Sequence, residues 1–496
     1  MRNIERSVAL TDSVNLALCD HLLKGDGEED LLFALWTPSL GAVRFTSLIH
    51  TPIPPLAGDR QRHGNASFNT QYFERVCKLA ASQPGCGIAF MHSHLGPGWQ
   101  GMSDDDVRAE LKIAGATAGL TDLPFVGLTV GTDATWSARM WPYAGNKEYG
   151  REWCTSVRSV GAQLRVNFMD ALRAQPVFRE LFKRTVTVWG ERNHATMARL
   201  RIGIVGLGSV GSLVAEMLAR MGLTNFVLID FDEVQAHNLD RLIGATQADI
   251  GVLKVVIAER QIRQSATADR IEVRAVPYSV AEETGYRAAL DCDVIFCCVD
   301  RPRARSILNH LAYAHLIPVI DGGIDVRFKR GEFSGVDWQL QTVAPGRACL
   351  ECLGTFLPSD VATEIEGKLD DPSYLRGLPA DHRFKRNENV FPFSANLASL
   401  EVLQLVALGT GIGGMTDFGV QRYRYLPGTI ETDVERTCRT SCEYVELTAQ
   451  GDRYFQVYGR DLSAEAARER QQCRADSSST GRLSRWLDRL RFWRTK

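Results

Sequence analysis

The sequence predicts an α/β protein with two successive domains, the second built on a mostly parallel sheet, and three observations point to this fold class. The chain has 496 residues, which exceeds the usual size of one compact domain. Short apolar runs typical of β-strands alternate with helical patterns along most of its length. Hydrophobic residues make up 45% and charged residues 23% of the chain, a balance that excludes a disordered, collagen-like or fibrous protein.

The first domain is predicted to occupy residues 1–148. Its apolar runs and helical patterns alternate, as expected of an α/β fold. A helical connector is predicted for residues 149–198. The predicted strands of the domain lie at 31–36, 43–48, 87–91 and 125–130, and its predicted helices at 69–82 and 104–115.

A pair of histidines ends one of these predicted strands. His92 and His94 are two residues apart, and alternate residues of a strand point to the same face. After a glycine-rich turn, Ser103 is the natural N-cap of a helix, and Asp106 in its first turn can direct a carboxylate towards the histidines. Two histidines and one aspartate leave a fourth coordination position open, which is typical of catalytic zinc. Such a site uses a nearby carboxylate as general base for the acidified water.

This pattern resembles the JAMM (MPN-type) metalloproteases, which remove ubiquitin and ubiquitin-like proteins and share the motif Glu…His-x-His-Pro…Ser-x-x-Asp. The resemblance implies an isopeptidase domain in which His92, His94 and Asp106 hold a catalytic Zn²⁺. It implies that Ser103 helps to stabilise the oxyanion. It also implies that an acidic residue at the start of an early strand activates the water.

The general base and the third metal ligand each have an alternative. Glu29, just before an early predicted strand, is our choice for the base, with Glu28 as the alternative. Leu95 stands where the motif has proline, and the segment between the second histidine and the serine is one residue longer than in the common motif. Asp105 therefore remains an alternative to Asp106 as the third ligand.

The second domain, residues 199–457, opens with a strand–turn–helix pattern. An apolar run at 200–205 leads into a glycine turn and a helical stretch, and the next apolar run ends at Asp230. Backbone N–H groups at such a turn bind phosphate together with the helix dipole, and Asp230 would bind a ribose hydroxyl. The pattern predicts a Rossmann-like domain that binds NAD, FAD or ATP. The glycines of the turn are Gly206, Gly208 and Gly211.

Charged residues beyond the turn favour ATP. Asn238, Arg241 and Lys254 follow the second predicted strand, and Asp300 follows a later one. A hydride-transfer enzyme needs no such set around its pyrophosphate, whereas an adenylating enzyme needs cations on the triphosphate and a carboxylate for Mg²⁺. We therefore predict that this domain binds ATP and Mg²⁺, and a dehydrogenase is the weakest interpretation.

These residues resemble the ThiF/MoeB/E1 family, which adenylates the C-terminal glycine of ubiquitin-like proteins. The resemblance implies that Arg241 and Lys254 contact phosphates, that Asn238 helps to position ATP and that Asp300 holds Mg²⁺. Arg184 matches an N-terminal arginine that in this family reaches the nucleotide of the other subunit. A homodimer is therefore implied.

Cysteines of the second domain form two pairs, Cys349 with Cys352 and Cys438 with Cys442. Four thiolates brought together by folding would form a closed structural Zn²⁺ site, which the same family often carries. Family members that pass their substrate on as a thioester usually have a cysteine after the first pair, and this sequence has none before the second. Transfer would then use a partner protein or another cysteine, Cys154 or Cys473, or the product would stay an acyl-adenylate.

Composition narrows the cellular environment and the class of partner. Lys and Arg number 57 and Asp and Glu 59, and the resulting net charge of −2 argues against a nucleic-acid partner. Residues 1–10 lack the apolar core of a secretory signal, and the most apolar segment, 391–415, is interrupted by polar residues and is predicted to be a core helix. Twelve cysteines without an export signal favour reduced thiols in the cytoplasm.

Residues 458–496 are predicted to be a linker and a basic amphipathic tail. The stretch 474–481 is small and polar, and apolar residues then recur at helical spacing among basic ones. We expect this tail to dock on a partner or on the protein itself rather than to contact a membrane surface. The apolar residues are Leu483, Trp486, Leu487, Leu490 and Trp493.

These features together predict a chain that acts on a ubiquitin-like or sulfur-carrier protein with a C-terminal glycine. The second domain would adenylate that glycine, and the first would cleave the amide bond that follows it. An E2-like protein is a further candidate partner. The alternatives are sulfur-carrier activation for cofactor or cysteine synthesis, and a non-catalytic scaffold that binds the carrier.

Overall fold

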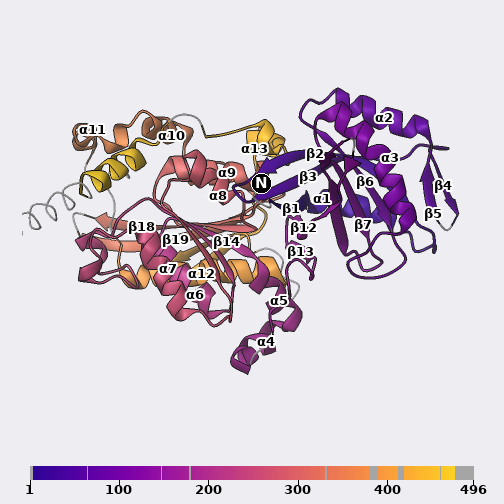
Figure 1. Cartoon of the computed structure of the whole chain (residues 1–496). Helices are drawn as coiled ribbons and strands as arrows, with labels where there is room; N and C mark the ends of the chain where they lie inside the picture. Colours follow the sequence, from indigo (N-terminus) through magenta and orange to yellow (C-terminus); the bar gives the residue numbers. More distant parts are fainter. Residues whose placement is uncertain are drawn as a thin grey trace, which may run out of the picture.

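The computed structural model describes residues 4–474 (Figure 1), except 64, 147, 178–179, 330–331, 380–381, 383–388, 412–417 and 458–459. The chain folds into two α/β domains that lie side by side, each built on its own large sheet. Both sheets have helices on their two faces, which is the arrangement that the alternating apolar and helical patterns predict.

The first domain is a mixed sheet with the strand order β11-β8-β7-β6-β2-β3-β1-β12-β13. Helix α1 (Asp12–Leu22) packs on one face, and α2 (Thr70–Ala81) and α3 (Asp104–Thr121) pack on the other. Two small hairpins, β4/β5 and β9/β10, lie beside this sheet. The strands are β1 (Glu5–Thr11), β2 (Leu31–Leu40), β3 (Arg44–Ile53), β4 (Arg60–His63), β5 (Asn65–Phe68), β6 (Gly87–Ser93), β7 (Phe125–Val130), β8 (Trp136–Trp141), β9 (Tyr143–Gly145), β10 (Glu148–Tyr149), β11 (Glu152–Trp153), β12 (Ser156–Val160) and β13 (Leu164–Phe168).

Strand β2 explains the uninterrupted apolar run near the start of the sequence. Leu31, Phe33 and Leu35 lie in the same core cluster as residues of α2 and α3. Leu32 and Trp36, which point to the opposite face, lie in the core cluster that contains α1 residues. A strand with helices on both faces needs apolar side chains at every position, so the run predicts such a strand correctly.

The second domain has the strand order β16-β15-β14-β17-β18-β19-β20-β21. Its strands are parallel from β16 to β18 and antiparallel from β18 to β21, so the sheet is mixed and its predicted nucleotide-binding half is parallel. The strands are β14 (Arg201–Val205), β15 (Asn225–Ile229), β16 (Glu272–Val276), β17 (Val294–Cys297), β18 (Val319–Lys329), β19 (Glu332–Val343), β20 (Val420–Arg424) and β21 (Thr429–Asp433).

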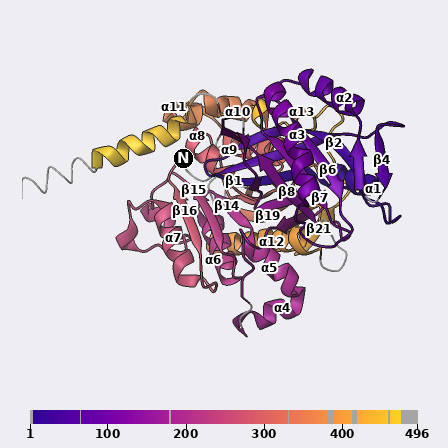
Figure 2. The same cartoon turned by 45° about the vertical axis from the view of Figure 1, so that its right-hand side comes forward.

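Helices cover both faces of this second sheet. Helices α6, α7 and α12 lie on one face, and α8 and α9 lie on the other (Figures 1 and 2). Further short helices, α10, α11 and α13, lie outside these layers. The helices are α6 (Ser209–Arg220), α7 (Lys254–Ser265), α8 (Glu283–Ala289), α9 (Pro302–Ala314), α10 (Pro358–Ile365), α11 (Pro372–Gly377), α12 (Phe391–Thr410) and α13 (Glu443–Glu446).

Helix α12 occupies the segment predicted to be a core helix. It is long and apolar enough to cross a membrane by composition alone. Its residues Ala398 and Leu405 are nevertheless fully buried, and the helix packs against α6 and β18 in the core of the second domain. The prediction of a core helix is therefore confirmed.

The predicted helical connector, residues 149–198, is wrong in its first half. Residues 152–168 form β11, β12 and β13, which complete the first sheet, and β12 pairs in parallel with β1. Apolar and polar residues alternate in Leu164–Phe168, which is a strand pattern that the helical prediction overlooked. Helices begin only with α4 (Lys183–Trp189) and α5 (Glu191–Arg199).

The predicted linker and tail also contain an element that the sequence analysis missed. Residues 462–474 form a helix that packs on the second domain. The apolar residues from Leu483 to Trp493, on which the docking prediction depends, lie outside the described residues.

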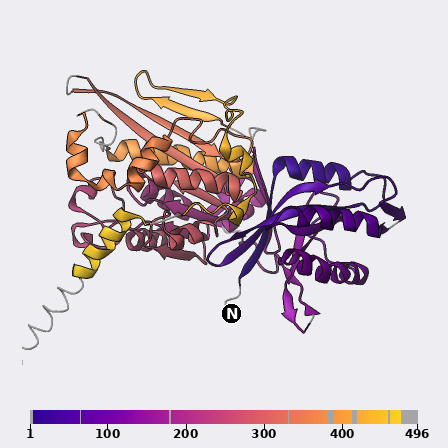
Figure 3. The ribbon, with the colours of Figure 1, turned by 90° about the horizontal axis from the view of Figure 1, so that it is seen from above.

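A buried cluster of charged side chains joins the two sheets. Arg44 of β3 and Arg158 of β12 reach Asp293, which precedes β17, at 2.6 Å and 3.4 Å, and all three side chains are fully buried. Arg44 also pairs with Glu5, which in turn lies 2.7 Å from Arg201 of β14. Burial raises the pKa of the Asp293 carboxyl, but the two arginines oppose it and hold that pKa well below its usual range. The cluster is therefore ionised and links three strands of the first domain to the second. Figure 3 shows the two domains side by side, seen from above.

Replacing the central aspartate tests this junction. In Asp293→Asn, two buried guanidinium groups lose their shared counter-ion, so we expect the free energy of unfolding to fall by about 3–5 kcal/mol in urea titrations followed by circular dichroism. Asp105→Asn removes the acidic partner of an exposed pair and is the matched control, with an expected loss of at most about 1 kcal/mol. Equal stability of the two variants would contradict a structural role for the buried cluster.

Candidate functional site

A cavity of about 1310 Å³ opens at the carboxyl ends of β14, β15 and β17. In a parallel sheet this edge is where ligands bind, because helix N-termini and loop amides converge there. The structure brings most of the predicted nucleotide residues to this cavity. Those that line it are Gly206, Gly208, Asp230, Asn238, Arg241, Lys254 and Asp300.

The glycine turn after β14 needs glycine for two different steric reasons. Gly206 has a φ of +89°, and a Cβ there would also overlap the carbonyl oxygen of Cys298. Gly211 lies in the first turn of α6, where a Cβ would overlap the carbonyl oxygen of Gly206. Gly211 therefore supports the turn from beneath, whereas Gly206 and Gly208 face the cavity. The amide groups at the start of α6 remain directed at the space where phosphates would bind.

A lysine among three carboxylates supplies positive charge beside this turn. The Lys254 ammonium donates to Asp232 at 2.7 Å. Burial alone would lower the pKa of Lys254, but Asp230, Asp232 and Asp300 raise it above its ordinary value. Lys254 is therefore a buried cation, which is the form that binds phosphate.

Asp230 has a second role that the sequence did not indicate. Its two carboxylate oxygens accept hydrogen bonds from the backbone N–H groups of Leu207, at 2.6 Å, and Asp232, at 2.8 Å. The residue thus ties the glycine turn to the end of β15. Burial raises its pKa, against the nearby charge of Lys254. A ribose hydroxyl would have to share this carboxylate with the turn.

The two arginines predicted to contact the nucleotide lie in different places. Arg241 is at the cavity, and its guanidinium donates to the carbonyl oxygen of His237 at 2.6 Å and to Asp240 at 2.8 Å. Arg184 lies on the exposed helix α4, which projects away from both sheets (Figures 1 and 2). It is not among the described residues that line the cavity of its own chain, so any contact with a nucleotide would be made in a second subunit.

The first domain brings His92, His94 and Asp106 together. The two Nε2 atoms lie 3.1 Å apart, and each is 3.4 Å from an oxygen of Asp106. Burial, with the help of the Arg139 guanidinium, lowers the pKa of His92 to about 3, so its ring is neutral. Two imidazole nitrogens and a carboxylate that converge within 4.8 Å fit the ligand set of zinc.

The start of helix α3 orients Asp106, the aspartate among these candidate metal ligands. The backbone N–H and the hydroxyl of Ser103 both donate to Asp106 Oδ2 at 2.8 Å, and the Asp106 N–H donates back to Ser103. Asp105, the alternative third ligand, pairs with Arg108 and is largely exposed. The structure therefore favours Asp106 at this position.

The pairing of β2 with β6 places Glu29 beside the candidate metal ligands His92, His94 and Asp106. Leu31 pairs with His92 in the antiparallel ladder, and Ser93 N–H donates to the carbonyl oxygen of Asp30, so Glu29 stands opposite His94. Burial raises the pKa of Glu29; His94 opposes this rise, and Asp106 adds to it. A carboxyl with a raised pKa next to a water-binding metal is suited to proton transfer.

A buried ion pair beneath His92 escaped the sequence analysis. Arg139 of β8 pairs with Glu110 of α3, and both side chains are almost fully buried. Arg139 also donates to the hydroxyl of Thr129, which lies 3.4 Å from His92 Nε2. In the sequence these are isolated charged residues on different elements, so no local pattern could have identified the pair.

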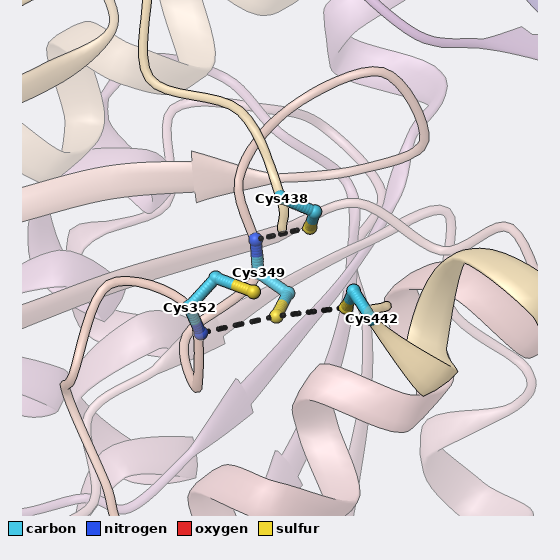
Figure 4. Close-up of side chains that lie close together, drawn as sticks. All are labelled: Cys349, Cys352, Cys438 and Cys442. Carbon is cyan, nitrogen blue, oxygen red and sulfur yellow. Dashed lines mark hydrogen bonds between the residues drawn. The ribbon is translucent and has the colours of Figure 1, made fainter. Parts of the chain in front are cut away.

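The predicted cysteine pairs meet in the second domain (Figure 4). The sulfurs of Cys349 and Cys442 are 3.7 Å apart, and the backbone N–H groups of Cys349 and Cys352 point at the sulfurs of Cys438 and Cys349. All four sulfurs lie within 4.8 Å of one another, which fits a closed tetrahedral zinc site.

The two candidate transfer cysteines lie in contrasting environments. Cys154 is fully buried, and burial raises the pKa of its thiol to about 12, so it is a poor nucleophile. Cys473 is exposed on the helix 462–474.

About half of the chain matches a known protein family. Residues 182–423 match the family model described as ThiF family. This part of the chain is a ThiF/E1-like domain. The match begins just before α4 and ends in β20, so it lies outside the first domain.

Relatives of this domain include enzymes of several kinds. The chain is 31% identical over 151 residues to tRNA threonylcarbamoyladenosine dehydratase of Escherichia coli (strain K12). This alignment covers 29% of this chain and 54% of that protein. It is 28% identical over 174 residues to molybdopterin-synthase adenylyltransferase of the same organism, covering 35% and 66%. It is 27% identical over 162 residues to ubiquitin-like modifier-activating enzyme 5 of Drosophila willistoni, covering 30% and 38%. The chain therefore spans about a third to two thirds of the length of these relatives.

Solved structures of E. coli MccB are also similar to this chain. The complex of MccB with ATP matches with a TM-score of 0.41 and 17% sequence identity, covering 54% of this chain and 74% of MccB.

Metal analysis tests both ligand clusters. We expect one zinc ion at each cluster, so His92→Ala and Cys349→Ser should each remove about one equivalent of zinc per chain in elemental analysis. Cys349→Ser should also lower the unfolding temperature, because a structural zinc contributes folding energy. Asp105→Asn and Cys473→Ser, which alter residues of the same types outside the clusters, should leave the zinc content unchanged. Full zinc content in His92→Ala would rule out the site in the first domain.

Proposed function

We propose that the second domain uses ATP to adenylate the C-terminal glycine of a ubiquitin-like or sulfur-carrier protein. The observation that carries this proposal is the meeting of Lys254, Arg241 and Asp300 at one cavity beside the glycine turn of a ThiF/E1-like domain. A cofactor that only transfers hydride would not need two cations and a separate carboxylate at this point.

The residues of the cavity divide the work of this reaction. Phosphates would lie against the amides at the start of α6, with Lys254 and Arg241 balancing their charge. Asp300 would hold Mg²⁺, which when bound offsets the charge of the leaving pyrophosphate. A carboxylate oxygen of the carrier's glycine would attack the α-phosphorus, forming an acyl-adenylate as the bond to the β-phosphate oxygen breaks. Arg184 of a second subunit would complete the site in a homodimer.

We propose further that the first domain hydrolyses an amide bond that follows the same glycine. His92, His94 and Asp106 would hold zinc, which when bound polarises the carbonyl and acidifies a water molecule. Glu29, which stands opposite His94, would accept the proton of that water and pass it to the leaving amine. Ser103 keeps Asp106 oriented and is the proposed donor to the oxyanion.

These two activities would allow the chain either to trim a carrier precursor and then activate it, or to attach and remove a modifier. An E2-like protein or a sulfur donor would accept the activated carboxyl, because no cysteine lies between the two zinc-binding pairs. Incubation with carrier, ATP and sulfide, followed by intact mass measurement, separates these outcomes. Exchange of one oxygen of the carrier for sulfur would favour the sulfur-carrier pathway.

Pyrophosphate exchange tests the adenylation proposal. With a carrier ending in glycine, the wild type should exchange labelled pyrophosphate into ATP, and Asp300→Ala and Lys254→Ala should lower the rate by about 100-fold or more, because each removes charge stabilisation of the transition state. Arg263→Gln, on the same helix as Lys254 but in an exposed pair with Glu259, should retain the wild-type rate. Carrier binding without any exchange would instead support a non-catalytic scaffold.

Cleavage of a carrier extended beyond its glycine tests the first domain and the choice of base. Glu29→Gln should lower the cleavage rate by about 100-fold or more, since it removes the proton acceptor, whereas Glu28→Gln should cleave nearly as well as the wild type. Cleavage is measured by gel and mass spectrometry, with Asp300→Ala as a control that should still cleave. A fully active Glu29→Gln variant would exclude this residue as the base.

A further inference from the structure

The helix 462–474 lies at the nucleotide cavity although it is outside the residues that match the ThiF family. Leu462, Ser463, Ala466 and Arg470 of this helix line the cavity together with the glycine turn and Asp230. The helix lies at the end of the second domain that faces away from the first domain (Figures 1 and 3). No part of the adenylation mechanism above makes use of it.

Small buried residues dock one side of this helix onto the domain. Ala464 is fully buried and Ala467 nearly so. The Ser463 hydroxyl donates to Asp370, near α11, and Arg303 at the start of α9 donates to the carbonyl oxygen just before the helix, at 2.9 Å. The first turn is thus attached beside the carboxyl end of β17.

Ion pairs fix the rest of the helix on the far side of the cavity. Arg468 makes a two-pronged pair with Glu282, which ends the loop after β16, and its guanidinium lies 5.2 Å from the centre of the Tyr278 ring. Arg474, in the last turn, pairs with Glu233 in the loop after β15. The helix therefore crosses the cavity from the side of β17 to the side of β15 and β16.

The order of the strands shows which part of the nucleotide this helix would cover. Phosphates would bind at the turn after β14, and the ribose near Asp230 at the end of β15. The next strand is β16, so the base lies towards the loop after it, where Tyr278, Ser279 and Val280 line the cavity. Ala466 and Arg470 line the same cavity, and Arg468 holds their helix against Tyr278.

We propose that the helix 462–474 is the outer wall of the base end of the nucleotide site and slows the release of bound nucleotide. This inference rests on the ATP site proposed above. Slow release would keep an acyl-adenylate in the site until an acceptor arrives. The Arg468–Glu282 pair is one of the attachments of this wall.

Nucleotide release rates test this role in the full chain. Dissociation of a ribose-labelled fluorescent ATP, in the presence of Mg²⁺, is followed by stopped flow after mixing with excess ATP. Arg468→Glu places two like charges at the attachment, so release should be about tenfold faster or more, the effect of losing about 1.4 kcal/mol. The charge swap Arg468→Glu with Glu282→Arg should return release to near the wild-type rate. Arg220→Glu, which breaks a comparable pair with Glu216 on the outer side of α6, should leave it unchanged.

Shortened chains separate the helix from the tail that follows it. A chain ending at Arg474 should release the labelled ATP as slowly as the full chain, and a chain ending at Asp461 should release it as fast as Arg468→Glu. Wild-type release from the chain ending at Asp461, or from Arg468→Glu, would refute the wall. If the wild type bound no labelled ATP at all, the nucleotide site itself would be refuted, which is a different result.

Discussion

The buried ion cluster between the two sheets is the constraint on which the rest of the structure depends. Asp293 lies between two guanidinium groups that water does not reach, and separating the domains would break both of these buried ion pairs. The free-energy penalty for such isolation is several times that of breaking a surface pair. The domains are therefore held in one orientation. Under the proposed function, a carrier protein that used both centres would have to move between them.

Local sequence patterns were sufficient to predict the two centres in outline. The glycine turn, the His92–His94 pair and the cysteine pairs each depend on neighbours that are close in sequence, and the structure brings each set together. Long-range pairing was not predictable in the same way. Strand β12 pairs with β1, which lies about 150 residues earlier in the chain, and the Arg139–Glu110 ion pair forms only when β8 packs against α3. The helix 462–474 was missed because its polar composition resembles that of a linker.

The two centres use burial in opposite ways. Burial and the nearby Arg139 favour a neutral His92 ring. Burial alone would raise the pKa of Asp106, but the histidines and the hydrogen bonds from Ser103 hold it well below its usual range, so the carboxylate is ionised. A neutral imidazole and a carboxylate are both forms that bind a metal ion. Around Lys254, three carboxylates keep the ammonium charged despite burial. A bound polyphosphate would replace these carboxylates as the partner of the ammonium. In each centre a neighbouring charged residue, Arg139 or Asp232, helps to set the charge state of a site residue.

The place of β12 in the first sheet has a consequence for the evolution and dissection of this chain. Because β12 and β13 follow the hairpin β9/β10 and close the sheet beside β1, the first domain is complete only at Phe168. A gene fragment that stopped at residue 148 would encode a protein with β1 exposed as a bare edge, open to pairing with other copies. Recombination that exchanges domains between such two-domain chains is therefore expected to tolerate crossovers after Phe168 and not before it.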